Sequence, residues 1–345
     1  RDYLAWASEP IEHRPSKQEM LAEVAQRFEA ARERLAAIVR QFEDEKSIVH
    51  QAQWDIATSW LTQARVVHGF SAVLARGQYV RAADELQDVA GRFPEHPRIG
   101  QVPDMLWQIA GELASRAFHD EAIEVWTDLT VHYPTHGQAM QARHRIAETY
   151  HHQLGRPLKA GEAYMELNFA HAGDDNAQQQ IQNTIFGIGS QLKNEKRWVE
   201  ALHVLESFVA TFPAHPRAGE ALTMVGQIHQ ANEAWADAIA AYERVIREFP
   251  EGQWVRTAKW AIAECTINVS RWREAMLAYH EYLRAYPNDG QQPEAERRIS
   301  ILKDLARYQA LVDEENHDKA FDAQYQIAEI VRDKLSIPVK AIIEY

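Results

Sequence analysis

The motif Trp198-Val-Glu-Ala201 recurs as Trp235-Ala-Asp-Ala238 and Trp272-Arg-Glu-Ala275. Eleven residues after each alanine stands an aromatic-proline pair: Phe212-Pro213, Phe249-Pro250 and Tyr286-Pro287. The alanines are therefore spaced 37 residues apart. A period of this length is typical of stacked supersecondary units. Because each unit in such a stack contacts only its neighbours, the pattern predicts an extended surface rather than one compact core.

The pattern continues towards both ends of the sequence. The units of Ala82 and Ala122 keep the apolar or aromatic position four residues after the alanine and the aromatic-proline pair. The units of Ala31 and Ala160 keep the helix positions but lack the proline. Ala341, with Pro338 before it and Tyr345 after it, opens a further copy that the given sequence does not finish.

Each unit is expected to be a pair of helices. In the second helix, Ala238, Tyr242, Val245 and Phe249 share one face because an α-helix has 3.6 residues per turn. Pro250 then ends that helix. Twelve residues before the repeat alanine, or thirteen in two units, a small residue recurs that would let the two helices approach closely: Ala110, Ala147, Gly189, Gly226, Ala263 and Ala328.

Taken together, these features resemble the tetratricopeptide repeat family over most of residues 17–345. The resemblance implies an all-α protein, an α-α superhelical solenoid of about fifteen to seventeen helices. Units of that family usually have 34 residues, so the longer step places extra residues in the linkers. The linkers Phe93-Pro-Glu-His-Pro97 and Phe212-Pro-Ala-His-Pro216 are similar to those of bacterial envelope members, which include outer-membrane assembly lipoproteins and the coordinator protein of the Tol-Pal system.

Breaks in the pitch divide the chain into four parts. Residues 1–16 are an irregular lead-in, residues 17–77 hold degenerate repeat helices, residues 78–287 hold regular repeats, and residues 288–345 hold a shortened unit and the unfinished repeat. The step from Ala31 to Ala82 is 51 residues, which is 14 more than 37. We expect this insertion to lengthen a first helix or to add a turn near residues 67–77.

Composition excludes several classes of function. The chain has 37 Lys and Arg against 50 Asp and Glu, a net charge of −13, which argues against nucleic-acid binding because that depends on cationic contacts. No apolar run approaches the roughly 18 residues of a spanning helix, so no membrane insertion by this segment is expected. The single cysteine, Cys265, is expected to be structural. The envelope resemblance favours a place in the bacterial cell envelope or periplasm.

No catalytic or cofactor site is predicted. Gly187-Ile-Gly189 would need to lie between a strand and a helix to hold a phosphate, but it falls inside a predicted helix. Three residues, His144, Glu148 and His152, share one helix face and have side chains that can bind zinc. A solvated polar face is the alternative that we favour, because one helix seldom supplies three ligands. We therefore predict no metal site.

The family resemblance implies that certain first-helix positions face a concave, partner-binding groove. They are Trp107, His144, Glu148, Phe186, Asn194, Gln227, Gln230, Trp260, Glu264 and Asn268. Aromatic anchors beside amides suit an extended peptide, whose backbone groups the amides can bond. The alternative is that the rings of Trp107, Phe186 and Trp260 are buried between helices. The Lys-plus-Asn clamp of chaperone-binding family members is not reproduced here.

Two functions are consistent with these features. The first is a non-catalytic scaffold whose concave face holds a protein segment, preferably one carrying Lys or Arg, within a bacterial envelope assembly. The second is a targeting or regulatory repeat region of a larger enzyme whose catalytic domain lies outside these residues. Both rest on resemblance of fold, which by itself does not establish function.

Overall fold

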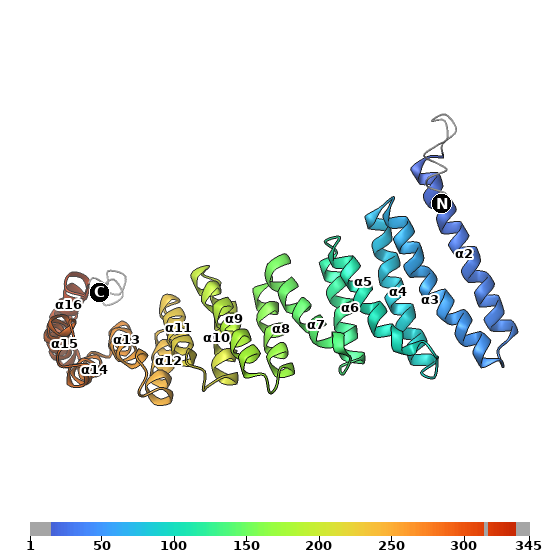
Figure 1. The fold of residues 1–345 in the computed structure, drawn as a ribbon. Helices are drawn as coiled ribbons and strands as arrows, with labels where there is room; N and C mark the ends of the chain where they lie inside the picture. The colour runs from blue at the N-terminus through green and yellow to red at the C-terminus, as the bar shows by residue number, and fades with distance from the viewer. Residues whose placement is uncertain (1–14, 314–316, 336–345) are drawn as a thin grey trace. The chain divides into compact units, whose positions relative to one another are not determined.

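The computed structural model describes residues 15–313 and 317–335 of the chain. These residues form fifteen α-helices, and none of them is in a β-strand (Figure 1). The prediction of an all-α solenoid is confirmed. The helices are α2 (Lys17–Gln41), α3 (Lys46–His68), α4 (Ala72–Arg92), α5 (Val102–Ala114), α6 (His119–His132), α7 (Gly137–Glu148), α8 (Pro157–Ala170), α9 (Asp175–Asn194), α10 (Trp198–Thr211), α11 (Ala218–Ala231), α12 (Trp235–Glu248), α13 (Trp254–Asn268), α14 (Trp272–Ala285), α15 (Gln292–Val312) and α16 (His317–Asp333).

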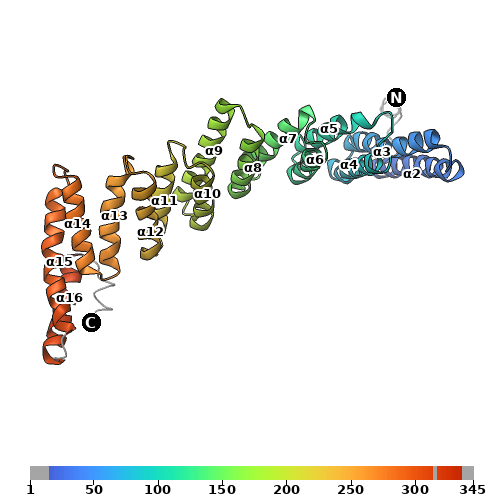
Figure 2. The same ribbon diagram turned by 90° about the horizontal axis from the view of Figure 1, so that it is seen from below.

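The helices divide into two units. Unit 1 contains α2 to α8 and ends at Gly173, and unit 2 begins at Asp174 and contains α9 to α16. Within each unit every helix packs against the next one in the chain, as Figure 2 shows from a second direction. The division falls inside the stretch 78–287 that was predicted as regular repeats. It lies where His171 and Ala172 replace the aromatic-proline pair. None of the helices described here is long and apolar enough to cross a membrane.

The core is built from the predicted stripe of the second helices. Ala201, Ala238 and Ala275 are completely buried, and so are the Tyr242 and Val245 side chains that follow Ala238. Burial of these apolar surfaces is the main favourable term in the stability of the array. Within unit 1 and within unit 2, each second helix packs against the first helix of its own pair and against that of the next pair, so the core runs from one helix pair into its neighbour.

The small residues of the first helices allow this close packing. A Cβ atom placed on Gly226 of α11 would lie 2.6 Å from the Tyr242 ring of α12. A Cβ atom on Gly189 of α9 would lie 2.7 Å from Leu205 of α10. Both distances are far below van der Waals contact, so only glycine fits at these helix separations.

One turn geometry recurs in the linkers between pairs. Each linker residue three positions after the aromatic donates its backbone N–H to the carbonyl of that aromatic, for example His96 to Phe93 at 2.9 Å. Its side chain then accepts a hydrogen bond from the N–H two residues further on. The accepting atoms are Nδ1 of His96 (3.0 Å), Nδ1 of His136 (3.4 Å), Nδ1 of His215 (3.1 Å) and Oδ1 of Asp289 (2.9 Å). Part of the histidine content therefore serves these turns, a role that the sequence analysis missed.

The turns inside the pairs follow a rule of their own. Each has one residue in the left-handed region five positions before the repeat alanine, at Ala117, Gly155, Lys196, Glu233 and Ser270. Gly77 holds the same position before Ala82, but it lies inside α4. The boundary predicted at residue 77 therefore falls inside this helix. The chain turns earlier, at residues 69–71, where the Ser71 hydroxyl accepts the Leu74 N–H, and the insertion lengthens both α3 and α4.

The C-terminal part contains one long helix, α15, followed by α16. The shortened unit was expected in this stretch, after Pro287. Pro338, Ala341 and Tyr345 of the expected unfinished repeat lie outside the described residues, as does most of the lead-in 1–16.

The close contact at Gly226 gives a first prediction. Gly226→Ala should destabilise the protein by about 1–3 kcal/mol, because the buried Tyr242 ring must move to admit the methyl group. Gly187→Ala is the matched control, since Gly187 is an exposed helix residue with no atom within 4 Å of its would-be Cβ. It should stabilise by roughly 0.5–1 kcal/mol through helix propensity. Urea denaturation measures both changes, and equal effects would contradict the assigned role of the small residue.

The linker histidines give a second prediction, on pH. Burial is the main cause that lowers the pKa of His96 and the pKa of His215 below the ordinary value. Because the unfolded chain takes up these protons more readily, the stabilisation is complete above about pH 6.5 and is lost as the pH falls through the lowered pKa values. The melting temperature should therefore fall on acidification. His96→Asn with His215→Asn keeps an acceptor but cannot titrate, and should flatten part of that decline. An unchanged pH profile in the double variant would refute this account.

Candidate functional site

The candidate groove residues lie on first helices of both units. Trp107 is on α5, and His144 and Glu148 are on α7, all in unit 1. The remaining candidates belong to unit 2: Phe186 and Asn194 on α9, Gln227 and Gln230 on α11, and Trp260, Glu264 and Asn268 on α13. We call the surface made by α5 and α7 the first-helix face of unit 1, and the surface made by α9, α11 and α13 the first-helix face of unit 2.

The first-helix face of unit 1 contains a hollow of about 680 Å³. Two predicted residues, Trp107 and Glu148, are brought together in it. Its wall consists of Trp107, Gln108, Gly111 and Ala114 from α5, His119 and Trp126 from α6, Arg145 and Glu148 from α7, and Thr149, His152 and Gln153.

Two tryptophans form the apolar part of the hollow. The half-buried ring of Trp107 lies 6.1 Å from the ring of Trp126, measured between centroids. Trp126 is 3% exposed, and its Nε1–H has no acceptor among the described residues. Glu148 is exposed, with a carboxylate oxygen 3.5 Å from Arg145. An indole surface therefore stands beside charged and amide groups that solvent can reach.

The repeat register explains why the hollow exists. Trp126 stands four residues after Ala122, as Tyr242 stands after Ala238. The Tyr242 hydroxyl donates to Gln230, which lies four residues after the small residue Gly226. The corresponding residues near Trp126 are Gly111 and Ala114, one and four residues after Ala110. Neither has a polar side chain to meet the indole N–H, and neither fills the space beside it.

An irregular helix turn forms one end of the hollow. Residues Thr149–Gln153 are a π-helix, η3, that directly follows α7. It absorbs the extra residue between Ala147 and Ala160, which sequence analysis had counted only as a step of thirteen. Single π-turns inside helices are frequent at functional sites. Here the turn places His152 and Gln153 at the hollow and Tyr150 on the opposite side.

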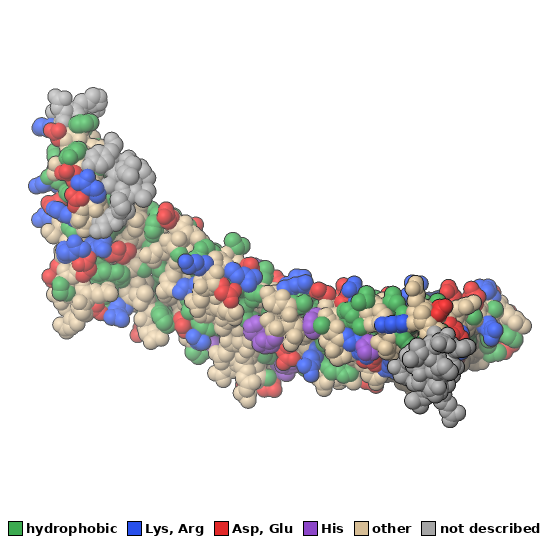
Figure 3. All heavy atoms as spheres, turned by 90° about the horizontal axis from the view of Figure 1, so that it is seen from above, with side chains coloured by type: hydrophobic (Ala, Val, Ile, Leu, Met, Phe, Trp, Pro, Cys, Tyr) green, Lys and Arg blue, Asp and Glu red, His purple; other side chains and the backbone are tan. Residues whose placement is uncertain are grey.

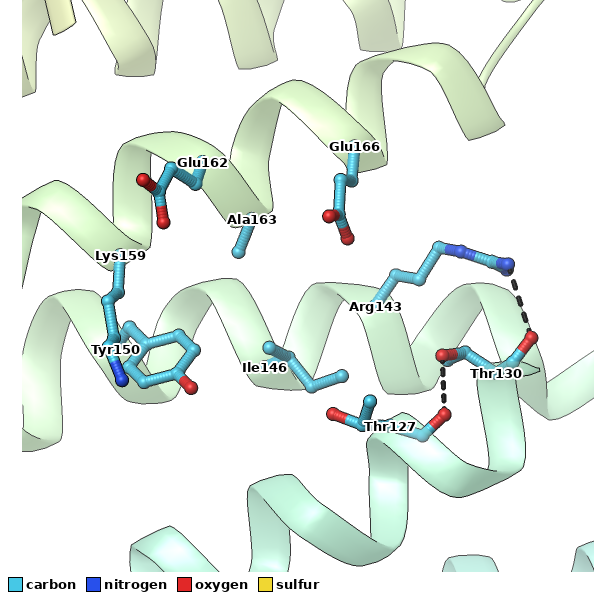
Figure 4. Close-up of a pocket in the computed structure, with 9 residues that line it drawn as sticks. All are labelled: Thr127, Thr130, Arg143, Ile146, Tyr150, Lys159, Glu162, Ala163 and Glu166. Carbon is cyan, nitrogen blue, oxygen red and sulfur yellow. Dashed lines mark hydrogen bonds between the residues drawn. The ribbon is translucent and has the colours of Figure 1, made fainter. Parts of the chain in front are cut away.

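Tyr150 lines a second hollow, of about 320 Å³, between α6, α7 and α8 (Figure 4). Glu162 and Glu166 point into it from α8, while Arg143 lies across from them on α7 and donates to the Thr130 carbonyl at 3.5 Å. Lys159 lies near the Tyr150 ring, its Nζ 5.5 Å from the centroid. No sequence pattern indicates this hollow, because charged residues at these positions look like any solvated helix surface.

His144 is not part of the first hollow. Its Nε2 lies 3.0 Å from Nε2 of His171, which follows α8, and the rings meet edge to face. Burial and the neighbouring His171 lower the pKa of His144. In the part of the chain that the structure describes, no three His, Cys, Asp or Glu side chains are placed to hold a metal ion.

Phe186 corrects the groove prediction in unit 2. Its side chain is 1% exposed, packs edge-on against Phe208 at 5.8 Å, and is covered by the Arg217 guanidinium at 3.7 Å from the ring centroid. Phe186 therefore belongs to the core and presents no ring to a partner. Trp260 is half-buried and packs edge-on against Tyr279 and Tyr282, at 5.1 and 5.3 Å.

Several polar candidates in unit 2 are engaged within the protein. Gln227 accepts a hydrogen bond from Lys193 at 2.6 Å, and Gln230 accepts one from Tyr242 at 3.1 Å. Glu264 accepts the Tyr279 hydroxyl and lies 3.4 Å from Arg298. Burial and Glu264 raise the pKa of Tyr279 far above its ordinary value, so the phenol stays a donor. Asn268 donates to the Glu264 carbonyl at 3.0 Å, whereas Asn194 is exposed on the surface.

Charges of both signs are interspersed over the visible face in Figure 3, with histidines among them. No broad region of one sign stands out there. On the face shown, the acidic side chains are thus not gathered into one patch.

Residues 220–252, which span most of α11 and α12, match the tetratricopeptide repeat family. This match supports the predicted repeat family for the helix pair of α11 and α12. No curated protein matches the sequence.

The fold is similar to several solved structures. The TPR2AB domain of yeast Sti1 in its pHSP90 complex has 14% identity and a TM-score of 0.30, over 72% of this chain and 99% of that chain. PilF of Pseudomonas aeruginosa has 16% identity and a TM-score of 0.29, over 70% and 97%. A tetratricopeptide repeat protein of Parabacteroides merdae has 12% identity and a TM-score of 0.26, over 84% and 98%. At these values no function carries over from them.

The burial of Phe186 gives a third prediction. Phe186→Ala should destabilise the protein by about 3–5 kcal/mol, because it leaves a cavity in the core of unit 2. Asn194→Ala, at an exposed position of the same helix, should change stability by less than about 0.5 kcal/mol. Urea denaturation of both variants tests this. A Phe186→Ala variant as stable as the parent would restore Phe186 as a surface anchor.

Proposed function

We propose that this protein is a non-catalytic scaffold that binds an extended protein segment on the first-helix face of unit 1. The observation that carries the proposal is the hollow beside Trp107 and Trp126. Tryptophans are enriched among the few residues that supply most of the energy at protein interfaces. A half-exposed indole at the rim of a hollow offers a partner side chain a large apolar contact area.

The polar rim suits a peptide backbone. Gln108 and Gln153 contribute amides, which can bond both N–H and C=O groups of an extended segment, and Glu148 contributes an exposed carboxylate. The first-helix face of unit 2 offers less, since Gln227, Gln230 and Glu264 already hold internal hydrogen bonds. We therefore propose the binding site on the first-helix face of unit 1.

The chemistry of the partner follows from charge. With a net charge of −13 and Glu148 at the hollow, we propose a segment that carries Lys or Arg. Association should then slow as the salt concentration rises, because ions screen the long-range attraction. The linker resemblance extends the proposal to an assembly of the bacterial cell envelope, which fractionation of the native cells would test.

The fourth prediction tests the proposed binding site at this hollow directly. Peptides are selected from a phage-displayed random library on the 345-residue chain. Trp107→Ala should weaken the selected peptides by about 1–2 kcal/mol, roughly five- to thirtyfold. Val131→Ala, at a 65% exposed position of α6, is the matched control and should bind as the parent does.

A second variant separates loss of binding from loss of folding. Ala114→Gln places in unit 1 the side chain that Gln230 has in unit 2, where it can accept the Trp126 N–H and fill the hollow. We expect an unchanged or higher melting temperature together with lost peptide binding. If the peptides bind folded Trp107→Ala and Ala114→Gln as tightly as the parent, the segment does not bind at this hollow.

A further inference from the structure

Four histidines form two touching pairs where α7 and η3 meet α8. His144 and His171 approach with their Nε2 atoms 3.0 Å apart. His151 and His152 are stacked, with ring centroids 4.3 Å apart. The His151 ring also meets the ring of Tyr164 on α8 edge to face, with the two centroids 6.1 Å apart. Two of these histidines, His144 and His152, were considered with Glu148 as possible zinc ligands in the sequence analysis, but the described residues contain no group of three side chains placed to hold a metal ion.

Both pairs are arranged for neutral imidazoles. The short distance between His144 and His171 requires one ring nitrogen to donate and the other to accept. Two protons there would place like charges in contact. His151 holds the register position of Gln230, and its buried Nδ1 has no partner among the described residues. A proton on that atom would be a buried donor without an acceptor, which is costly.

The surrounding charged groups oppose the neutral form of these imidazoles only in part. Glu148, one turn after His144 on α7, favours its charged form. From α8, Tyr164 faces His151, while Lys159 and Glu162 lie with Tyr150 on the far side of η3. From α6, His119 lies with His152, Arg145 and Glu148 around the hollow. His152 thus belongs both to the stacked pair with His151 and to the lining of the hollow proposed as the binding site.

We propose that these two histidine pairs are a pH-sensitive junction, which holds α7 and η3 against α8 when neutral and loosens on mild acidification, so that the bound segment is released. The release step rests on the proposed function, whereas the loosening does not. The link between them is His152, because a shift of η3 moves one wall of the hollow.

The direction of the pH effect follows from burial. Burial, followed by the neighbouring imidazole, lowers the pKa of His144 and the pKa of His151. A group of this kind contributes stability above the unfolded value of about 6.5 and loses it as the pH falls through the lowered pKa. The junction should therefore be closed at neutral pH and open in mild acid.

The fifth prediction concerns the full chain without any partner. Hydrogen exchange is measured at about pH 7.5 and about pH 5.5, on either side of the ordinary histidine pKa, and corrected for intrinsic rates. In acid, α7, η3 and α8 should lose roughly tenfold protection relative to α15, which contains no histidine and follows the linker turn of Asp289; tenfold corresponds to one pKa unit. Unchanged protection of these helices in acid would overturn the proposal.

Variants assign the effect to the pairs. His151→Phe with His144→Asn keeps a ring against Tyr164 and an acceptor at His171, but neither new side chain can take a proton. This double variant should keep its protection in acid, whereas His132→Gln, at an exposed position of α6, should lose protection as the parent does. A double variant that loosens like the parent would also overturn the proposal.

A binding measurement completes the test. A peptide selected at about pH 7.5 should bind the parent at least tenfold more weakly at about pH 5.5, and the double variant should show a smaller change. Equal affinity at both pH values would refute regulated release. Failure to select any peptide at neutral pH would count against the proposed function, while the exchange measurement would still decide the fate of the junction.

Discussion

The contact between a small residue on one helix and a large side chain on its partner sets the geometry of each pair. Tyr242 lies over Gly226 with no room for a methyl group, and Leu205 lies over Gly189 in the same way. Because interiors are packed as densely as organic crystals, this contact fixes how closely the two helices approach. The distance between the two helices of a pair in turn sets where the surface residues of the first helix lie. The proposed binding face therefore depends on a buried contact of which it is not part.

A second constraint fixes how one pair follows the next. In most linkers the residue three positions after the aromatic also supplies a side-chain acceptor, as His96, His215 and Asp289 do, whereas Gly252 makes the turn without one. Imidazole and carboxylate perform the same task here but respond differently to pH. Arg256 lowers the pKa of Asp289 to about 2, so the Asp289 carboxylate stays charged in mild acid, whereas His96 and His215 are neutral at neutral pH and take up a proton as the pH falls through their lowered pKa values. The choice of linker residue therefore decides where the array is sensitive to acid.

The sequence was sufficient for the helices but not for the neighbours of each side chain. Alanine and aromatic positions with a closing proline locate a helix, since its period and its end are local properties. Register also predicted that Trp107 and Glu148 share one face, and both residues line the hollow of unit 1. The sequence register could not show that Arg217 covers Phe186, because that contact comes from the next helix pair. It also could not show that α4 continues through Gly77, whose residue type is common in turns.

The two units show how one repeat yields both a closed and an open face. Where the first helix carries Gln230 or Glu264, the tyrosine of the second helix has a partner and the surface is sealed by that hydrogen bond. Where it carries Gly111 and Ala114, Trp126 has no partner, and a hollow remains. Where it carries His151, the partner is a group that titrates. Changes at the two positions one and four residues after the small residue thus distinguish a sealed surface, the hollow that we propose as a binding site and the proposed pH-sensitive contact, without altering the fold.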